Sequence, residues 1–206
     1  DNFNILTANK IGIALVPTIK DSINLRNEFQ DKNLTFTIKY RCIFNEKLKN
    51  GRECMKQKEK DMSVKLLNEL LANSAVLLVQ TLNYHWNLVG REFHDYHILF
   101  DKQYKQIFED MDSIAERIRA IDGIALGSMQ AFLKQATIVE DTGKVPNPTQ
   151  MVAKLFQQHE YYVEQIRDGI QNLEKSSDFG TKKMLEDLIE RYEKILWMLR
   201  ALVSKK

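Results

Sequence analysis

From Ser63 onward, hydrophobic residues recur every three or four positions, the spacing of amphipathic helices. One long helix is predicted from about Ser63, taken as its N-cap, to near Val89, with Gly90 ending it. A second is predicted over 93–121, with Gly123 after it. The inward-facing positions of these two helices are predicted to be Leu66, Leu67, Leu70, Leu71, Ala75, Leu78, Val79 and Leu82, then Tyr96, Phe100, Tyr104, Ile107, Met111, Ile114 and Ile118.

The same periodicity predicts two more long helices and one short one. Asn147-Pro148 has the residue types of an N-cap followed by a first helical position, and a last helix is predicted from near Thr181 to Leu202. A short helix is expected at 128–135, within the long connection between the second and third helices. The inward stripes are Met151, Leu155, Tyr162, Ile166 and Ile170, then Leu185, Leu188, Tyr192, Ile195, Leu199 and Leu202. The predicted fold is therefore all-α, a four-helix bundle with one long crossover, as in ferritin-like bundles.

Residues 1–61 differ from the rest and are predicted to be a separate segment. They contain a strand-like alternation over 34–44, and they hold 12 of the 30 Lys and Arg residues and 8 of the 28 Asp and Glu residues. Residues 62–206 thus carry 18 basic and 20 acidic residues, a net charge of −2. Lys58-Glu59 can be encoded by a ribosome-binding sequence upstream of a start codon at Met62. Our hypothesis is that 1–61 is upstream sequence translated by mistake; the alternative is an accessory extension.

The composition favours a globular helical protein and limits its metal chemistry. The chain of 206 residues is 44% hydrophobic, with only 3 prolines and 8 glycines. No apolar run approaches the ~20 residues of a membrane span, and the start does not resemble a signal peptide, so a cytoplasmic location without a membrane partner is expected. Both cysteines, Cys42 and Cys54, lie in the first part. A metal held by the helical part would therefore need His, Asp and Glu.

Candidate metal ligands lie along the second helix. His97 and Asp101 are spaced i, i+4, and Asp112 and Glu116 repeat that spacing on the same side of the helix. Imidazole with several carboxylates favours iron or manganese. Asp101 and Asp112 are nevertheless about 16 Å apart along a helix, too far for one metal centre. A single kind of site thus requires two chains with this helix packed antiparallel across a two-fold axis, and His85 would add to the His97 half.

The alternative to a metal site is an ordinary solvated face. In that interpretation Asp112 and Glu116 form ion pairs with Arg117 and Arg119, and the histidines are capping or core residues. A helical assembly subunit without metal would follow from it.

The segment NYHWNLVGREFHDYHILFDKQYKQIFEDMDSIAERIRAIDG resembles the signature of the Dps family, ferritin-like proteins of starved bacterial cells. The similarity covers about Ser63 to Ser204 and extends to SDFGTKKMLEDLIERYEKILWMLRAL. The resemblance implies a homo-dodecameric shell built from two-fold dimers. It also implies that ferroxidase centres at the two-fold interfaces oxidise Fe(II), preferably with hydrogen peroxide, and that ferric mineral is stored inside. Protection against oxidative stress follows.

The family's ligand positions match five residues of this chain. His85, His97 and Asp101 match the ligands from one subunit, and Asp112 and Glu116 match those from its partner. Iron is accordingly the expected metal, bound where the spacing along the helix also requires two chains. The absence of Glu-x-x-His counts against the intrasubunit di-iron site of ferritin.

The remaining histidines and the tryptophans are assigned other roles. His94 is interpreted as an accessory or surface residue and His159 as structural. Trp86 is expected beside the centre, as a packing residue or, alternatively, as a sacrificial electron donor. Trp197 is expected in the core.

Two features depart from the family's usual properties. In the family, iron usually enters through acidic three-fold pores, and Glu174 and Asp178 are the candidate carboxylates for such a pore here. Lys182 and Lys183 lie nearby in sequence, so the sequence does not determine the route by which iron enters. DNA binding is expected to be weak. Many family members bind phosphates with a Lys-rich amino-terminal tail, whereas a chain that starts at Met62 has only Lys65 for this purpose. The net negative charge of residues 62–206 also repels phosphates. The alternative function is a nucleoid-associated, DNA-binding protein whose metal site is structural.

Overall fold

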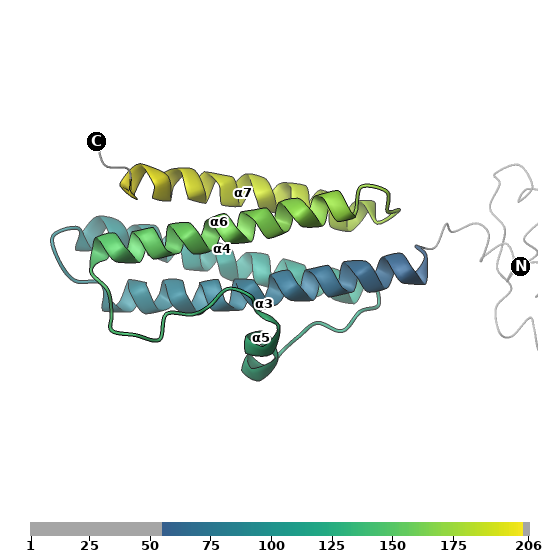
Figure 1. The fold of residues 1–206 in the computed structure, drawn as a ribbon, viewed down its shortest axis with the longest axis horizontal. Coiled ribbons are helices and arrows are strands. Elements are labelled where there is room, and N and C mark those ends of the chain that lie inside the picture. The colour runs from purple at the N-terminus through teal and green to yellow at the C-terminus, as the bar shows by residue number, and fades with distance from the viewer. Residues whose placement is uncertain (1–54, 204–206) are drawn as a thin grey trace, which may run out of the picture. The chain divides into compact units, whose positions relative to one another are not determined.

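The computed structural model describes residues 55–203, which form an all-α bundle with a long crossover (Figure 1). The four long helices are α3 (Gln57–Asn87), α4 (Phe93–Ala120), α6 (Pro148–Asn172) and α7 (Phe179–Val203), and the short helix is α5 (Met129–Gln135). The strand-like alternation and both cysteines lie outside the described residues. The predicted fold class is confirmed.

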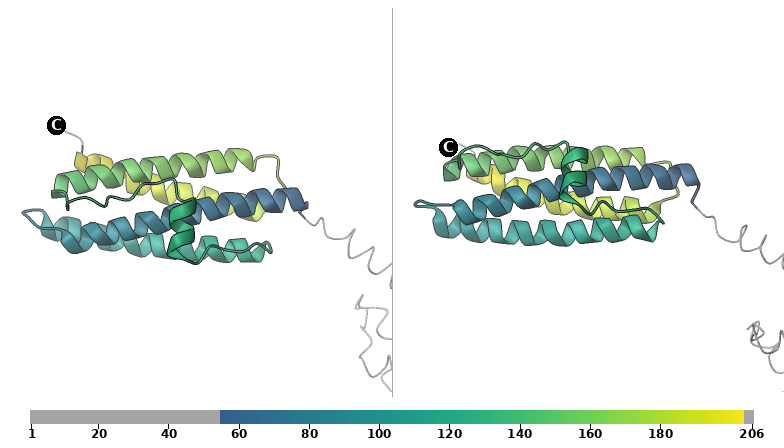
Figure 2. Two further views of the ribbon diagram at one scale, coloured as in Figure 1. Left: turned by 60° about the horizontal axis from the view of Figure 1, so that its bottom comes forward. Right: turned by 90° about the horizontal axis from the view of Figure 1, so that it is seen from below.

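The helices pack as two antiparallel pairs. α3 lies against α4 and α6 against α7, and α3 also contacts α6 and α5 (Figures 1 and 2). Of the neighbouring pairs around the bundle, α4 and α7 make the sparsest contact. The buried apolar side chains of all four helices form one core cluster.

The predicted helix boundaries hold closely except at the start of α3. Ser63 is not an N-cap: it lies fully buried inside α3, which begins at Gln57 after Lys56, without a side-chain cap. No helix breaker separates Gln57 from Ser63, so the helix continues back through Glu59 and Lys60, which contact Ser177 and Asp122. The predicted domain boundary at Met62 remains a prediction.

Residues with strong conformational preferences mark several of the other helix ends. Asn147 caps α6 in a capping box with Gln150, and Ser128 caps α5. Gly90, with φ of 125°, lies in the turn between α3 and α4, a conformation that glycine adopts without strain. α7 begins at Phe179 rather than near Thr181.

The inward stripes are largely confirmed, with two exceptions. Val79 and Leu202 are exposed, by 42% and 41%. Both lie at the edges of their stripes, where periodicity does not define how far the buried face extends. By length and composition alone α3 would be sufficient for a membrane span, but its apolar side chains form the bundle core.

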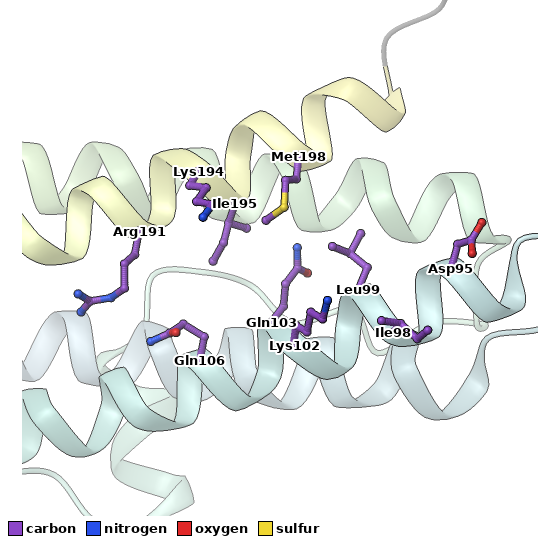
Figure 3. Close-up of a pocket in the computed structure, with 10 residues that line it drawn as sticks. All are labelled: Asp95, Ile98, Leu99, Lys102, Gln103, Gln106, Arg191, Lys194, Ile195 and Met198. Atoms are coloured by element: carbon purple, nitrogen blue, oxygen red, sulfur yellow. The ribbon is translucent and has the colours of Figure 1, made fainter.

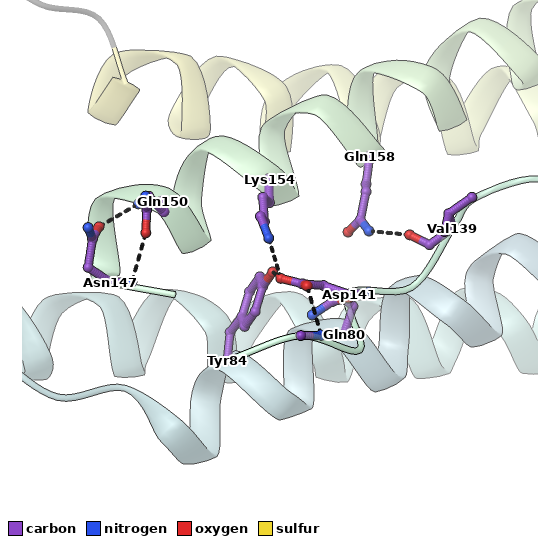
Figure 4. A network of polar contacts seen from close by, with 9 residues as sticks. Gln80, Tyr84, Val139, Asp141, Asn147, Gln150, Lys154 and Gln158 are labelled. Atoms are coloured by element: carbon purple, nitrogen blue, oxygen red, sulfur yellow. Dashed lines mark hydrogen bonds and ion pairs between the residues drawn. The ribbon is translucent and has the colours of Figure 1, made fainter. Parts of the chain in front are cut away.

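The crossover between α4 and α6 is fastened to the bundle by a polar network around Asp141 (Figure 4). The Tyr84 hydroxyl donates to Asp141 Oδ2 at 2.9 Å, Lys154 forms an ion pair with the same oxygen, and the Asp141 amide donates to Gln80 Oε1 at 2.6 Å. Side chains from α3 and α6 therefore both bond to the crossover at Asp141. Hydrogen bonds from Lys154 and Tyr84 lower the pKa of Asp141.

Candidate metal centre

The structure brings His85 and His97 into direct contact at the end of α3 and the start of α4. Their rings are stacked, with centroids 3.8 Å apart and an interplanar angle of 18°. His85 Nδ1 lies 3.1 Å from the His97 backbone oxygen, and His97 Nδ1 lies 3.1 Å from the His85 backbone oxygen. Because a carbonyl only accepts, each Nδ1 carries the proton in these bonds. Each Nε2 is left with the lone pair that a metal ligand needs.

Asp101 lies one turn beyond His97 and carries an ionised carboxylate. Lys105 Nζ lies 2.7 Å from its Oδ2, and the Tyr104 hydroxyl donates to its Oδ1 at 2.9 Å. These bonds, Lys105 first, lower the pKa of Asp101. Tyr104 also meets the His85 ring edge-on at 5.2 Å. Sequence interpretation missed Tyr104 as a partner of the site and assigned it to the core, although its i, i+3 spacing from Asp101 was a usable signal.

Asp112 and Glu116 lie farther along α4 and are exposed. Neither has a hydrogen bond or ion pair within residues 55–203. The alternative in which they pair with Arg117 and Arg119 is wrong for this structure. Arg117 forms an ion pair with Asp178, and Arg119 donates to the backbone oxygen of Gly123.

In the described part of a single chain, no three His, Cys, Asp or Glu side chains gather closely enough to hold a metal ion. The two imidazoles meet, and Asp101 is one turn away with both oxygens engaged. Along the helix axis, Asp112 lies about 16 Å and Glu116 about 22 Å beyond Asp101. One chain alone thus has two separate groups of candidate ligands.

Exposed apolar side chains accompany these two groups. On α4, Phe108 lies between Asp101 and Asp112 in sequence and is 63% exposed, and Trp86 beside His85 is 67% exposed. Phe93 is also exposed, and its ring stacks on His97 at 4.9 Å. Phe108 had not been singled out from sequence, because its position falls off the predicted core stripe. Exposed aromatic groups of this size are typical of surfaces that other chains cover.

The remaining histidines and Trp197 are not part of the contact between His85 and His97. His94 is exposed, as predicted, and His159 is fully buried in the bundle. Trp197 is 64% exposed, so its predicted place in the core is wrong; on α7 its neighbours Ile195, Leu196 and Leu199 face inward instead.

Asp178 does not line a pore in this structure. Its carboxylate is buried, accepts a hydrogen bond from the Thr181 amide at 3.0 Å and forms the ion pair with Arg117. It therefore acts as the cap of α7. Nearby, Lys183 forms an ion pair with Asp187 one turn along the same helix.

The ferritin-like domain family matches residues 64–206. The DNA protection during starvation protein of Brevibacillus brevis is 30% identical over 150 residues, which cover 73% of this chain and 100% of that protein. The chain belongs to the Dps family of ferritin-like proteins.

Two further proteins are similar to this chain. The crystal structure of the Dps protein from Vibrio cholerae O1 has a TM-score of 0.69 and 28% identity, covering 74% of this chain and 99% of that chain. That protein is described as a member of a broad superfamily of ferritin-like diiron-carboxylate proteins. A low temperature-induced protein of Nostoc sp. is 42% identical over 142 residues, covering 68% of this chain and 79% of the relative.

Proposed function

We propose that the protein is a ferroxidase and iron-storage protein whose iron site is shared by two subunits. His85, His97 and Asp101 of one chain would bind Fe(II) together with Asp112 and Glu116 of its partner. The observation that carries the proposal is the paired orientation of His85 and His97, which leaves both Nε2 atoms available. Membership of a family with a diiron-carboxylate relative supports iron as the metal.

The ligand set suits the oxidation of Fe(II) by hydrogen peroxide. Two Fe(II) ions each give one electron, the O–O bond breaks, and both oxygens leave as hydroxide or water rather than as free hydroxyl radical. Carboxylates and neutral imidazoles stabilise the additional positive charge of Fe(III) while leaving coordination positions open. The ferric product would be stored inside a homo-dodecameric shell in the cytoplasm, which removes both iron and peroxide.

The spacing of the two ligand groups supports an antiparallel arrangement of α4 helices across a two-fold axis. Such an axis places the His97 end of one helix beside the Glu116 end of the other and creates two identical sites per dimer. The exposed Phe108 lies between the two groups, where it would be covered by the partner. Trp86, exposed next to His85, is proposed to pack at this interface.

Complementation tests the shared site. One variant carries His85→Ala and His97→Ala, and another carries Asp112→Ala and Glu116→Ala. Each is expected to lose most peroxide-dependent Fe(II) oxidation, measured by the absorbance of Fe(III). A mixed dimer has one site with two intact halves, so co-assembled shells should recover part of the activity. Mixed shells as inactive as their parents would refute the shared site.

A matched control variant and a second measurement distinguish a shared ferroxidase site from a nonspecific loss of carboxylates and from a structural metal site. Glu186→Ala with Glu190→Ala removes two exposed carboxylates at the same i, i+4 spacing on α7 and should leave oxidation unchanged. Thermal stabilisation by Zn(II) without any iron oxidation would instead indicate a structural metal site, as expected for the DNA-binding alternative.

A further inference from the structure

A cavity of about 520 Å³ lies between α4 and α7, apart from the ligands discussed above (Figure 3). It occupies the side of the bundle where two neighbouring helices make their sparsest contact. Its volume is in the range of small-molecule sites, roughly 300–1,000 Å³. The apolar part of its wall consists of Ile98, Leu99, Ile195 and Met198.

Gln103 is an unsatisfied polar group in this cavity. Its side chain points from α4 toward α7 beneath Ile195 and Met198 (Figure 3), and the residue is 2% exposed. Neither its amide nitrogen nor its amide oxygen has a hydrogen-bond partner in the described part of the chain. Burying an unpaired amide costs free energy, so a buried glutamine of this kind indicates a missing partner. Met198, a flexible side chain, can expose the amide by changing rotamer.

Two exposed lysines contribute positive charge to the wall of the cavity. Lys102 from α4 and Lys194 from α7 both line it, and neither has an ion pair within residues 55–203. Arg191, the third cation, donates to Asp110 at 2.8 Å and is thus already neutralised. A negatively charged group between the two lysines would meet two charges that are not compensated by an ion pair, although solvent screens them because both lysines are exposed.

The polar and apolar ends of the cavity are separated along α4. Gln103 and Gln106 lie toward Arg191, whereas Leu99 and Ile98 lie toward the start of the helix (Figure 3). Residues 98 and 106 are about 12 Å apart along the helix axis. At the far rim Asp95 carries negative charge, which disfavours an anionic group at the apolar end.

We propose that this cavity binds an amphiphilic carboxylate, with its acidic group at Gln103, Lys102 and Lys194 and its aliphatic chain along Leu99, Ile98 and Met198. The Gln103 amide nitrogen donates to the carboxylate, and the two ammonium groups balance its charge. The aliphatic chain replaces water against these three apolar side chains. A small inorganic anion would satisfy the charges but leave the apolar wall wet, and a neutral alkane would leave Gln103 unpaired.

Binding of decanoate to the full-length assembled protein tests the proposal. Calorimetric titration should give up to one decanoate per subunit, with decanol at least tenfold weaker and inorganic phosphate not detectably bound. A decanoate analogue with a diazirine in its chain should crosslink to peptides that contain Leu99 or Met198. Decanol equal to decanoate, phosphate binding as tightly as decanoate, or crosslinks confined to other helices would each overturn the proposal.

Variants assign the binding to these residues. Lys102→Ala with Lys194→Ala should raise the decanoate Kd at least tenfold, and Gln103→Leu should raise it at least fivefold while increasing the Tm. The matched control, Lys134→Ala with Lys175→Ala, removes two exposed lysines outside the cavity and should leave the Kd unchanged. Retention of the parental Kd in the cavity variants, with unchanged assembly, would refute the site.

Discussion

The rings of His85 and His97 are stacked 3.8 Å apart, and each Nδ1 is bonded to the backbone oxygen of the other residue. The turn through Gly90 makes this possible, because it brings the end of α3 beside the start of α4. Each imidazole is held by the backbone that carries the other, so neither orientation is independent. The pair therefore behaves as a single structural unit.

This mutual dependence predicts non-additive effects of His85→Ala and His97→Ala. Each single variant should lower the rate of peroxide-dependent Fe(II) oxidation by about 10–100-fold, because the remaining imidazole loses the contact that orients it. The double variant should be little worse than the more damaging single one. His94→Ala, which removes an exposed histidine of the same segment, is the control and should be unaffected. Fully multiplicative losses would show that the two rings act independently.

The carboxylate of Asp178, which caps α7, predicts how the free energy of unfolding depends on pH. Burial raises the pKa of Asp178, but hydrogen bonds from Thr181 and the charge of Arg117 outweigh it, so the pKa lies below its usual value. The ionised form therefore stabilises the folded state above the unfolded-state pKa near 4, and this contribution is lost as pH falls through the folded-state pKa. Asp178→Asn should lower the free energy of unfolding by about 1–3 kcal/mol at neutral pH.

Denaturant titrations at several pH values check this prediction. The difference between parent and Asp178→Asn should shrink as the pH falls below about 4. Asn retains an oxygen for the Thr181 amide, so Asp178→Ala, which removes cap and charge together, should cost about 1 kcal/mol more at every pH. If the difference in free energy of unfolding between the parent and Asp178→Asn does not change with pH, the effect comes from packing rather than from charge.

Buried His159 gives a pH dependence of its own in the acid range. Burial lowers its pKa from 6.5 to about 3, and neither ring nitrogen has a hydrogen-bond partner in the described residues. Between these values the unfolded chain binds a proton that the folded chain does not, so stability falls as pH falls. This loss amounts to about 1.4 kcal/mol per pH unit for one proton.

His159→Leu should therefore unfold at a lower pH than the parent. Leucine is close to histidine in size and leaves no unpaired nitrogen beside Tyr192, whose ring lies 5.6 Å from that of His159. Acid titration followed by circular dichroism measures the midpoint, with His94→Leu as the exposed control. An unchanged midpoint would mean that His159 is not buried in the assembled protein.

Much of the architecture was predictable because it depends on local patterns. The cap at Asn147 and the end of α3 near Gly90 follow from single residues with strong conformational preferences. Ser63 was misassigned because a good capping residue is equally able to lie inside a helix when the preceding residues continue it. Trp197 was misassigned because periodicity identifies an apolar stripe without showing which neighbour covers its edge.

The contacts of the candidate site could not be predicted from its residues. Spacing on one helix places His97 and Asp101 together, and the family signature adds His85. The reciprocal bonds between ring and backbone depend on the turn geometry between two helices, which no spacing rule gives. Asp178 was likewise assigned to a pore, because its partner Arg117 lies 61 residues away in sequence and is brought close only by tertiary packing.

Because Tyr84 bonds to the crossover at Asp141, we expect Tyr84→Phe to destabilise the crossover locally rather than the whole bundle. Tyr84 is 1% exposed, and burial and its bond to Asp141 raise the pKa of its hydroxyl, so the group stays protonated and donates. Phenylalanine preserves the buried ring but removes that donor, which should cost about 1 kcal/mol. Asp141 keeps Lys154 and the bond to Gln80, so the bundle should remain folded.

Hydrogen exchange and limited proteolysis locate that effect. In Tyr84→Phe, amides near residue 141 should exchange faster and the crossover should be cleaved sooner, while amides in the middle of α4 and α7 remain protected. Gln80→Ala, which removes the acceptor of the Asp141 amide, should have the same local signature, and the two variants together should free the segment more than either alone. Tyr161→Phe, an exposed tyrosine on α6, serves as the control. Uniformly faster exchange across the four long helices would show instead that Tyr84 supports the whole core, and that the crossover is not an independently opening unit.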